Sequence, residues 1–175
     1  MTYNDQIQQK EFEIVKDPRV KISQADYEDQ LEFLINVRDE VSRANQKIID
    51  IRNIKNNMIF ISEKTRDNIE LQEMINKYLN DISEIENNIH MTKNQSRQDP
   101  LNYGIRINNR IAFLLADSQR GDYPPTNQAK AFFREITAEL DREMEALEKL
   151  LNGSISRLNE IVSDNQIGIF SLKSP

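Results

Sequence analysis

Apolar residues recur along most of the chain at steps of three and four, the spacing of one face of an α-helix. The first such row follows Ser23, a favourable N-cap residue, with Asp26 in the first turn. It predicts a helix of roughly 35 residues, on the order of 50 Å long at 1.5 Å per residue. Its apolar positions are Tyr27, Leu31, Leu34, Val37, Val41, Ala44, Ile48, Ile51, Ile54, Met58 and Ile61. The uniformly apolar segment 58–61 is expected near one end of the fold.

A second row lies in residues 71–89, where the steps alternate between four and three. This is the a/d pattern of a heptad seam. Its positions are Leu71, Ile75, Tyr78, Ile82, Ile85 and Ile89. The polar stretch from Thr92 to Pro100 that follows predicts a loop.

Two further helices are predicted in the last third of the chain. A short one covers about residues 105–119, with Ile107, Ile111, Leu114 and Leu115 facing inward. A long one begins after Thr126, which is a good N-cap residue. Gly153 falls inside the long pattern and marks either a bend or a close contact. The inward positions of the long helix are Ala129, Phe133, Ile136, Leu140, Met144, Leu147, Leu151, Ile155, Leu158 and Val162.

The two ends of the chain have a different pattern. Residues 11–15 alternate and are rich in β-prone types, which predicts one short strand. A lone strand has no partner and is not stable by itself. Residues 166–172 are apolar and extended in character, and we expect this tail to fold back onto the helices, because its large side chains would otherwise be exposed.

Together these patterns predict an all-α fold, an up-and-down helical bundle of three to four long amphipathic helices with a short N-terminal strand and an extended C-terminal tail. Residues 1–20 would be a remnant strand and linker, residues 21–165 the bundle, and residues 166–175 the tail. The pattern does not repeat at a fixed period, which disfavours a solenoid.

Composition narrows the classes further. Hydrophobic residues make up 38% of the chain and charged residues 30%, with only four glycines, so many-turned all-β folds are disfavoured. The net charge is -6, and the cations are scattered among the acids, so nucleic-acid binding is not expected. The absence of cysteine excludes disulfides and thiol chemistry. No apolar run approaches the length of a membrane span.

Catalytic and metal motifs are missing as well. Di-iron bundles need Glu-x-x-His motifs, but the chain has one histidine, His90, and Asn87 stands three residues before it. We assign His90 to the C-terminal end of its helix, near the helix dipole. The acidic pairs Glu84 with Glu86 and Asp141 with Glu145 are interpreted as solvated helix faces. We therefore predict no enzyme, no cofactor and no metal.

The segment from Arg120 to Thr126 reads RGDYPPT and admits two interpretations. Its first three letters match a cell-adhesion tripeptide, but a three-letter match has a high false-positive rate. As a helix corner, Arg120 suits the last helical turn and Gly121 suits a C′ position with positive φ. Asp122, Tyr123, Pro124 and Pro125 then form a stiff turn. Since each residue has a structural role, the corner is favoured.

Two motifs carry a resemblance to a known family. One is Phe12, Val15, Asp17, Pro18 and Arg19, and the other is the turn with Asp122, Pro125 and Thr126. The chain, over about residues 11–172, resembles the C-terminal region of large bacterial proteins with BNR or sortilin-like β-propeller repeats, which are often called glycosyl-hydrolase-like. The resemblance implies an exported parent, secreted, periplasmic or in the cell envelope, whose propeller and β-sandwich domains precede this module. It transfers no catalytic residue.

Three functions stay open at this point. The first is a non-catalytic C-terminal module for domain packing or protein contact. The second is a stand-alone coiled-coil-like assembly protein, because heptad helices leave a homodimer open. The third is an accessory domain in carbohydrate processing. Candidate interface or turn residues are Phe12, Asp17, Pro18, Arg19, Arg120, Gly121, Asp122, Tyr123, Pro124 and Pro125.

Overall fold

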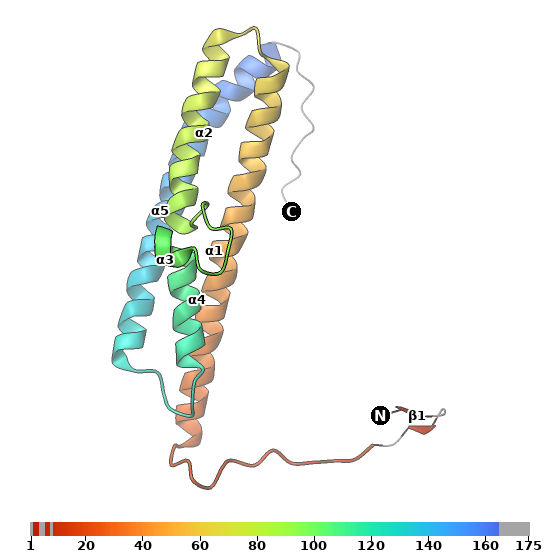
Figure 1. The fold of residues 1–175 in the computed structure, drawn as a ribbon, viewed down its shortest axis with the longest axis vertical. Helices are drawn as coiled ribbons and strands as arrows, with labels where there is room; N and C mark the ends of the chain where they lie inside the picture. The colour runs from red at the N-terminus through yellow and green to blue at the C-terminus, as the bar shows by residue number, and fades with distance from the viewer. Residues whose placement is uncertain (1, 4–5, 8, 165–175) are drawn as a thin grey trace.

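The computed structural model describes residues 2–3, 6–7 and 9–164, and it is a bundle of long helices with an N-terminal arm (Figure 1). Five helices are present in the described chain: α1 (Gln24–Lys64), α2 (Ile69–Ile89), α3 (Pro100–Tyr103), α4 (Ile107–Ser118) and α5 (Asn127–Asp164). Two minimal strands, β1 (Thr2–Tyr3) and β2 (Gln6–Ile7), pair antiparallel ahead of the arm. The all-helical bundle is thus confirmed, while the number and course of the helices differ from the prediction.

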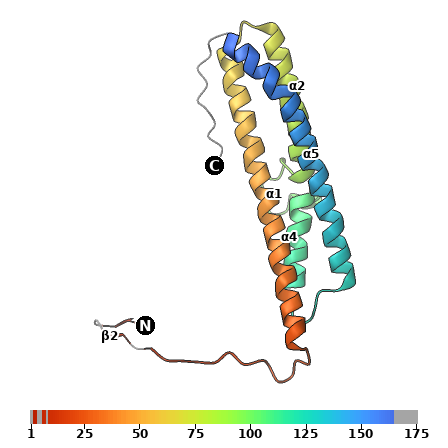
Figure 2. The same ribbon diagram turned by 180° about the vertical axis from the view of Figure 1, so that it is seen from behind.

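The helices form three columns. α1 is one column of 41 residues, about 60 Å long at 1.5 Å per residue. α5 is a second column of 38 residues. The third column consists of α2 followed by α4, which run in the same direction one after the other, as both views show (Figures 1 and 2). The prediction that every successive helix reverses direction was therefore wrong for α2 and α4.

Side-chain caps define where the helices begin. Ser23 and Asp26 form a reciprocal capping box: the Asp26 amide donates to Ser23 Oγ at 3.2 Å, and the Ser23 amide donates to Asp26 Oδ2 at 2.8 Å. Thr126 Oγ1 accepts from the Ala129 amide at 3.0 Å at the start of α5. Both N-caps match the sequence prediction.

The core runs along the centre of the three columns. The Ile75, Ile82 and Ile89 side chains of the α2 seam are fully buried, and Phe33 of α1 meets Phe133 of α5 edge to face at 5.7 Å. One predicted core position was wrong, because Leu31 is exposed while Gln30 and Phe33 point inward. The buried apolar cluster comprises Phe33, Val37, Ala44, Ile48, Ile51, Met58, Leu71, Ile75, Ile82, Ile85, Ile89, Ile107, Ile111, Leu114, Ile136, Leu140, Met144 and Leu147.

The predicted strand at residues 11–15 is not formed. This segment is irregular chain within an arm, residues 9–22, that leads away from the end of the bundle (Figure 1). The β-prone residues lack a partner strand in the described chain, and without ladder hydrogen bonds the pattern does not produce a strand. The expected fold-back of the tail at residues 166–172 lies outside the described residues.

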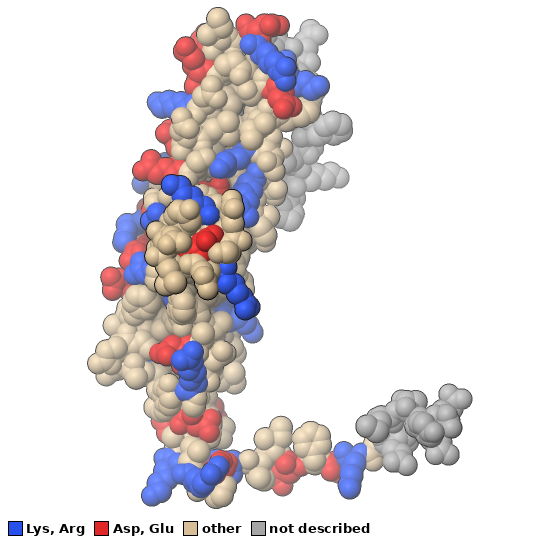
Figure 3. Space-filling view, in the orientation of Figure 1, with Lys and Arg blue, Asp and Glu red and all other residues tan. Residues whose placement is uncertain are grey.

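None of the helices in the described part of the chain is long and apolar enough to cross a membrane. Lys and Arg are interspersed with Asp and Glu over the face shown in Figure 3, in keeping with a solvated bundle surface.

Candidate functional site

The arm joins the bundle through a tight elbow, residues 16–23. Asp17, Pro18, Arg19 and Val20 form a β-turn in which the Val20 amide donates to the Asp17 carbonyl oxygen at 3.0 Å. Aspartate and proline hold the first two positions, where each is favoured. The Asp17 carboxylate accepts from the Arg19 amide at 2.9 Å and from Arg19 Nη2 at 2.7 Å. These hydrogen bonds lower the pKa of Asp17.

Lys16 fastens the base of the arm to the first turns of α1. Its Nζ donates to the Ile22 carbonyl oxygen and lies 5.8 Å from the centroid of the Tyr27 ring. The elbow therefore has a defined shape, although every residue of the arm before it is exposed.

The second group of predicted residues lies in the turn between α4 and α5, residues 119–126. Gly121 has φ +80°, so the expected left-handed conformation is confirmed. The helix itself ends at Ser118. Arg120 is therefore beyond the last turn, exposed, rather than within it as predicted. Pro124 and Pro125 are half-buried and lead into the Thr126 cap.

Gln30 of α1 holds this turn in place. Its Nε2 donates to the Ser118 carbonyl oxygen at 3.1 Å and to the Gly121 carbonyl oxygen at 2.9 Å. A helix end leaves carbonyl groups without intrahelical partners, and Gln30 provides donors for two acceptors at this end. Sequence reasoning missed Gln30 because it assigned Leu31 to the core. The available signal was that Gln30, Phe33 and Val37 share a face.

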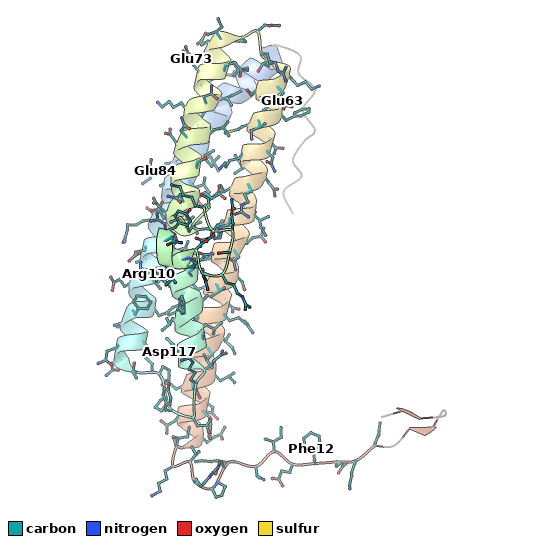
Figure 4. The ribbon with its side chains drawn as sticks, viewed as in Figure 1. Phe12, Glu63, Glu73, Glu84, Arg110 and Asp117 are labelled. Atoms are coloured by element: carbon teal, nitrogen blue, oxygen red, sulfur yellow. The ribbon has the colours of Figure 1, made fainter. Side chains whose placement is uncertain are left out.

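Tyr27 brings the two groups of predicted residues together. Burial raises the pKa of the Tyr27 phenol, and the charge of Asp122, a hydrogen bond with Asp122 and the charge of Asp17 raise it further. Asp17 and Asp122 thus lie near the same side chain, at the end of the bundle where the arm begins. Phe12 is not part of this cluster, because it lies out along the arm, to one side of the helices (Figure 4).

These contacts support the corner interpretation of RGDYPPT. The Asp122 side chain faces Tyr27, and Gln30 binds the backbone at Gly121. Each of the three residues after the RGD sequence contributes to the turn or to the approach to α5. The tripeptide is thus a structured part of the bundle end.

One acidic residue is in a different environment from the one predicted. Glu84 is exposed, as expected of a solvated face, but Glu86 is only 3% exposed. Glu86 Oε1 accepts from Arg52 Nε at 2.8 Å, and Oε2 accepts from Lys55 Nζ at 2.8 Å. Burial raises the pKa of Glu86, but the hydrogen bonds and charges of Lys55 and Arg52 outweigh it, so the net shift is downward.

His90 caps the C-terminal end of α2, as predicted. Its amide donates to the Glu86 carbonyl oxygen, and its Nδ1 lies 3.2 Å from Asn108 Nδ2 of α4. Burial lowers the pKa of His90, and the charge of Arg52 adds to this effect. His90 therefore links the two halves of the interrupted column. Among the residues that the structure describes, no group of His, Asp and Glu could hold a metal ion.

Comparisons with protein-family models, with curated proteins and with solved structures give no match for this chain. The resemblance to propeller-repeat proteins consequently rests on the motifs at the elbow and at the α4–α5 turn.

Proposed function

We propose that this chain is a non-catalytic helical module that attaches to a neighbouring β-rich domain through its N-terminal arm. In the context that the resemblance implies, the neighbour is a β-sandwich or propeller domain that precedes the module in an exported bacterial protein. The bundle positions that domain, and the arm supplies the contact.

The observation that carries the proposal is the exposure of large apolar side chains on the arm. Phe12 is 85% exposed, Ile14 is 88% exposed and Val15 is 72% exposed. Scattered exposed apolar residues are normal on a protein surface, but here three of four successive residues, interrupted by Glu13, are large, apolar and exposed. Such a segment is typical of a chain that is covered by a partner.

The backbone of the arm supports the same proposal. Within the described residues, the first backbone hydrogen bond after residue 8 is the Val20 to Asp17 bond of the elbow. Unpaired N–H and C=O groups on an extended segment are what an exposed sheet edge pairs with when it gains a strand. The alternation of Glu11, Phe12, Glu13 and Ile14 puts apolar and acidic side chains on opposite sides of such a strand.

The elbow explains how the contact could position a domain. The Asp17 turn and the Lys16 contacts fix the base of the arm against α1, while the capping box fixes the start of the helix. A rigid base joined to an unpaired segment allows strand pairing with a neighbouring sheet to set the orientation of the bundle. Asp17, Pro18 and Arg19 therefore act as joint residues, and Phe12 acts as a contact residue.

The test is binding between this chain and the separately expressed segment encoded immediately upstream in its gene. We expect association measurable by calorimetry, and we expect a Phe12→Asp, Ile14→Asp double variant to lose it, because two charges would enter an apolar interface. A Glu11→Gln, Glu13→Gln variant of the same segment serves as the matched control and retains binding.

Two results would contradict the proposal. One is unchanged binding by the aspartate variant. The other is a gene in which the reading frame starts at Met1 and encodes no domain before it.

A specific observation also favours a second candidate, self-assembly. Ile35, Ile49 and Phe60 are exposed on α1 (38%, 51% and 46%) and lie on the face opposite its buried row. A homodimer through this face would cover them. We rank this second because these side chains are spaced far apart along the helix, whereas Phe12, Ile14 and Val15 lie within four successive positions of the arm.

A further inference from the structure

A hollow of about 480 Å³ lies between α1 and α2, on the flank of the column that α2 and α4 form. It is open to solvent and lined mainly by side chains that can hydrogen-bond. The lining residues that can hydrogen-bond are Arg52, Lys55 and Asn56 of α1, Ser83 and Glu86 of α2, and Thr92 just after α2. None of the residues that line it belongs to the elbow or the arm, so a ligand site here does not depend on the proposed function.

Glu86 holds the two cations of the hollow in fixed positions. Its buried carboxylate binds Arg52 through Nε and Lys55 through Nζ, one oxygen to each. A side chain fixed by a buried partner loses less rotamer entropy on binding a ligand. Glu86 therefore preorganises donors that it does not itself saturate.

Both cations have donors left for a ligand. Arg52 is 52% exposed, and its terminal nitrogens Nη1 and Nη2 have no hydrogen-bond partner among the described residues. These two nitrogens form the end-on fork that matches the two oxygens of a carboxylate. Lys55 uses one of its three N–H donors on Glu86.

The charge balance selects a monoanion. Arg52 and Lys55 carry two positive charges, and Glu86 offsets one, so the charged residues that line the hollow keep one uncompensated positive charge. Burial and the charge of Arg52 lower the pKa of nearby His90, which disfavours a further positive charge there. A singly charged carboxylate neutralises the hollow, whereas a doubly charged phosphate leaves an excess negative charge beside the Glu86 carboxylate.

We propose that this hollow binds a carboxylate ligand, held by the terminal nitrogens of Arg52 and by Nζ of Lys55. Asn56 and Thr92 at the rim provide neutral polar groups that contact the rest of the ligand. Glu86 is a positioning residue for the two donors and does not touch the ligand.

The probe is acetate, titrated into the full chain while the backbone amides are followed by NMR. Sodium acetate replaces sodium chloride at constant ionic strength, so that general screening does not change. We expect saturable shifts at the amides around Arg52, Lys55 and Ser83, with a dissociation constant on the order of 1 mM, as for a ligand of few atoms. Shifts that grow linearly without saturation would overturn the proposal.

Three variants make the result specific. Arg52→Gln should weaken acetate at least about tenfold, because a charge-assisted pair of hydrogen bonds is lost. Asn56→Asp keeps both ion pairs of Glu86 and places a negative charge at the rim, so it should weaken acetate comparably even if Arg52→Gln is poorly folded. Arg38→Gln is the matched control, since the Arg38 side chain is exposed on α1 and pairs with the adjacent Asp39, away from the hollow.

The assignment is overturned if Asn56→Asp binds acetate as the natural chain does. It is also overturned if Arg38→Gln weakens acetate as much as the two hollow variants. Inorganic phosphate tests the charge argument: tighter binding of phosphate than of acetate at pH 8 would contradict the carboxylate assignment.

Discussion

Glu86 shows how a single residue can depart from the pattern around it. It lies four residues after Ile82 and three before Ile89, at the edge of the α2 seam, and is buried against α1. Removing a carboxylate from water is unfavourable, but Arg52 and Lys55 supply two charge-assisted hydrogen bonds. The downward shift of its pKa shows that the ionised form prevails in the fold.

We predict that Glu86→Gln lowers the free energy of unfolding at pH 7 by about 1–2 kcal/mol, since it leaves two cations without their anion while half-exposed Arg52 can still be solvated. Glu84→Gln, on the exposed face of the same helix, should change it by less than about 0.5 kcal/mol. Urea unfolding of both variants measures the difference. Equal stability of the two variants would show that the ion pairs of Glu86 with Arg52 and Lys55 contribute nothing to the free energy of unfolding.

The pH dependence of the same variant follows from the sign of the shift. A carboxyl group whose folded pKa lies below its ordinary value of 4.5 stabilises the fold above that value, and the contribution is lost as pH falls below it. The natural chain should therefore lose more stability between pH 5 and pH 3 than Glu86→Gln does.

At the scale of the elements, the sequence predicts the helices well. The heptad seam identifies α2, the expected range 105–119 brackets α4 (Ile107–Ser118), and Ser23 and Thr126 are confirmed N-caps. These features succeed because they depend on neighbours within one or two turns. Residues 11–15 and Leu31 were misjudged because strand formation and burial depend on partners that are remote in sequence. The contacts of Gln30 with the α4–α5 turn, and those of Glu86 with Arg52 and Lys55, were missed for the same reason.

Alanine substitution at two glycines should change the stability of the fold in opposite directions. Gly121→Ala should destabilise the fold by about 1 kcal/mol, because an L residue at φ +80° is strained and its Cβ would lie 3.0 Å from Tyr123 Cε1. Gly153→Ala should stabilise it by about 0.5–1 kcal/mol, because Gly153 is within α5 and an added Cβ meets nothing within 4 Å. Thermal unfolding of the two variants measures both effects. A gain in stability for Gly121→Ala would reopen the adhesion interpretation of the turn.

At the scale of the whole molecule, helix length explains the three columns. α2 has 21 residues and α4 has 12, while α1 and α5 have 41 and 38. Neither short helix can cover the apolar row of a long one, but the two together can when they lie end to end. The segment between them is long enough to permit either direction, so spacing within each helix could not decide the course. Comparing the lengths of the short helices with those of the long ones could have predicted that α2 and α4 lie end to end.

The three columns close one core within a single chain, so we predict that the isolated protein is a monomer. Among the described side chains, the buried residues of α1 and α5 belong to one apolar cluster with those of α2 and α4. Light scattering across a range of concentrations measures the mass. A stable dimer at micromolar concentration would instead support self-assembly through the outer face of α1.

We propose that the arm is an unpaired segment that becomes a strand when it pairs with the edge of a neighbouring sheet. Amide hydrogen exchange at residues 9–16 tests it most directly, in this chain alone and in the polypeptide that includes the segment encoded upstream. We expect exchange near the rate of unstructured chain in the first case, and protection of about a hundredfold or more at alternate amides in the second, as for a paired strand. Equally fast exchange of these amides in both would contradict it.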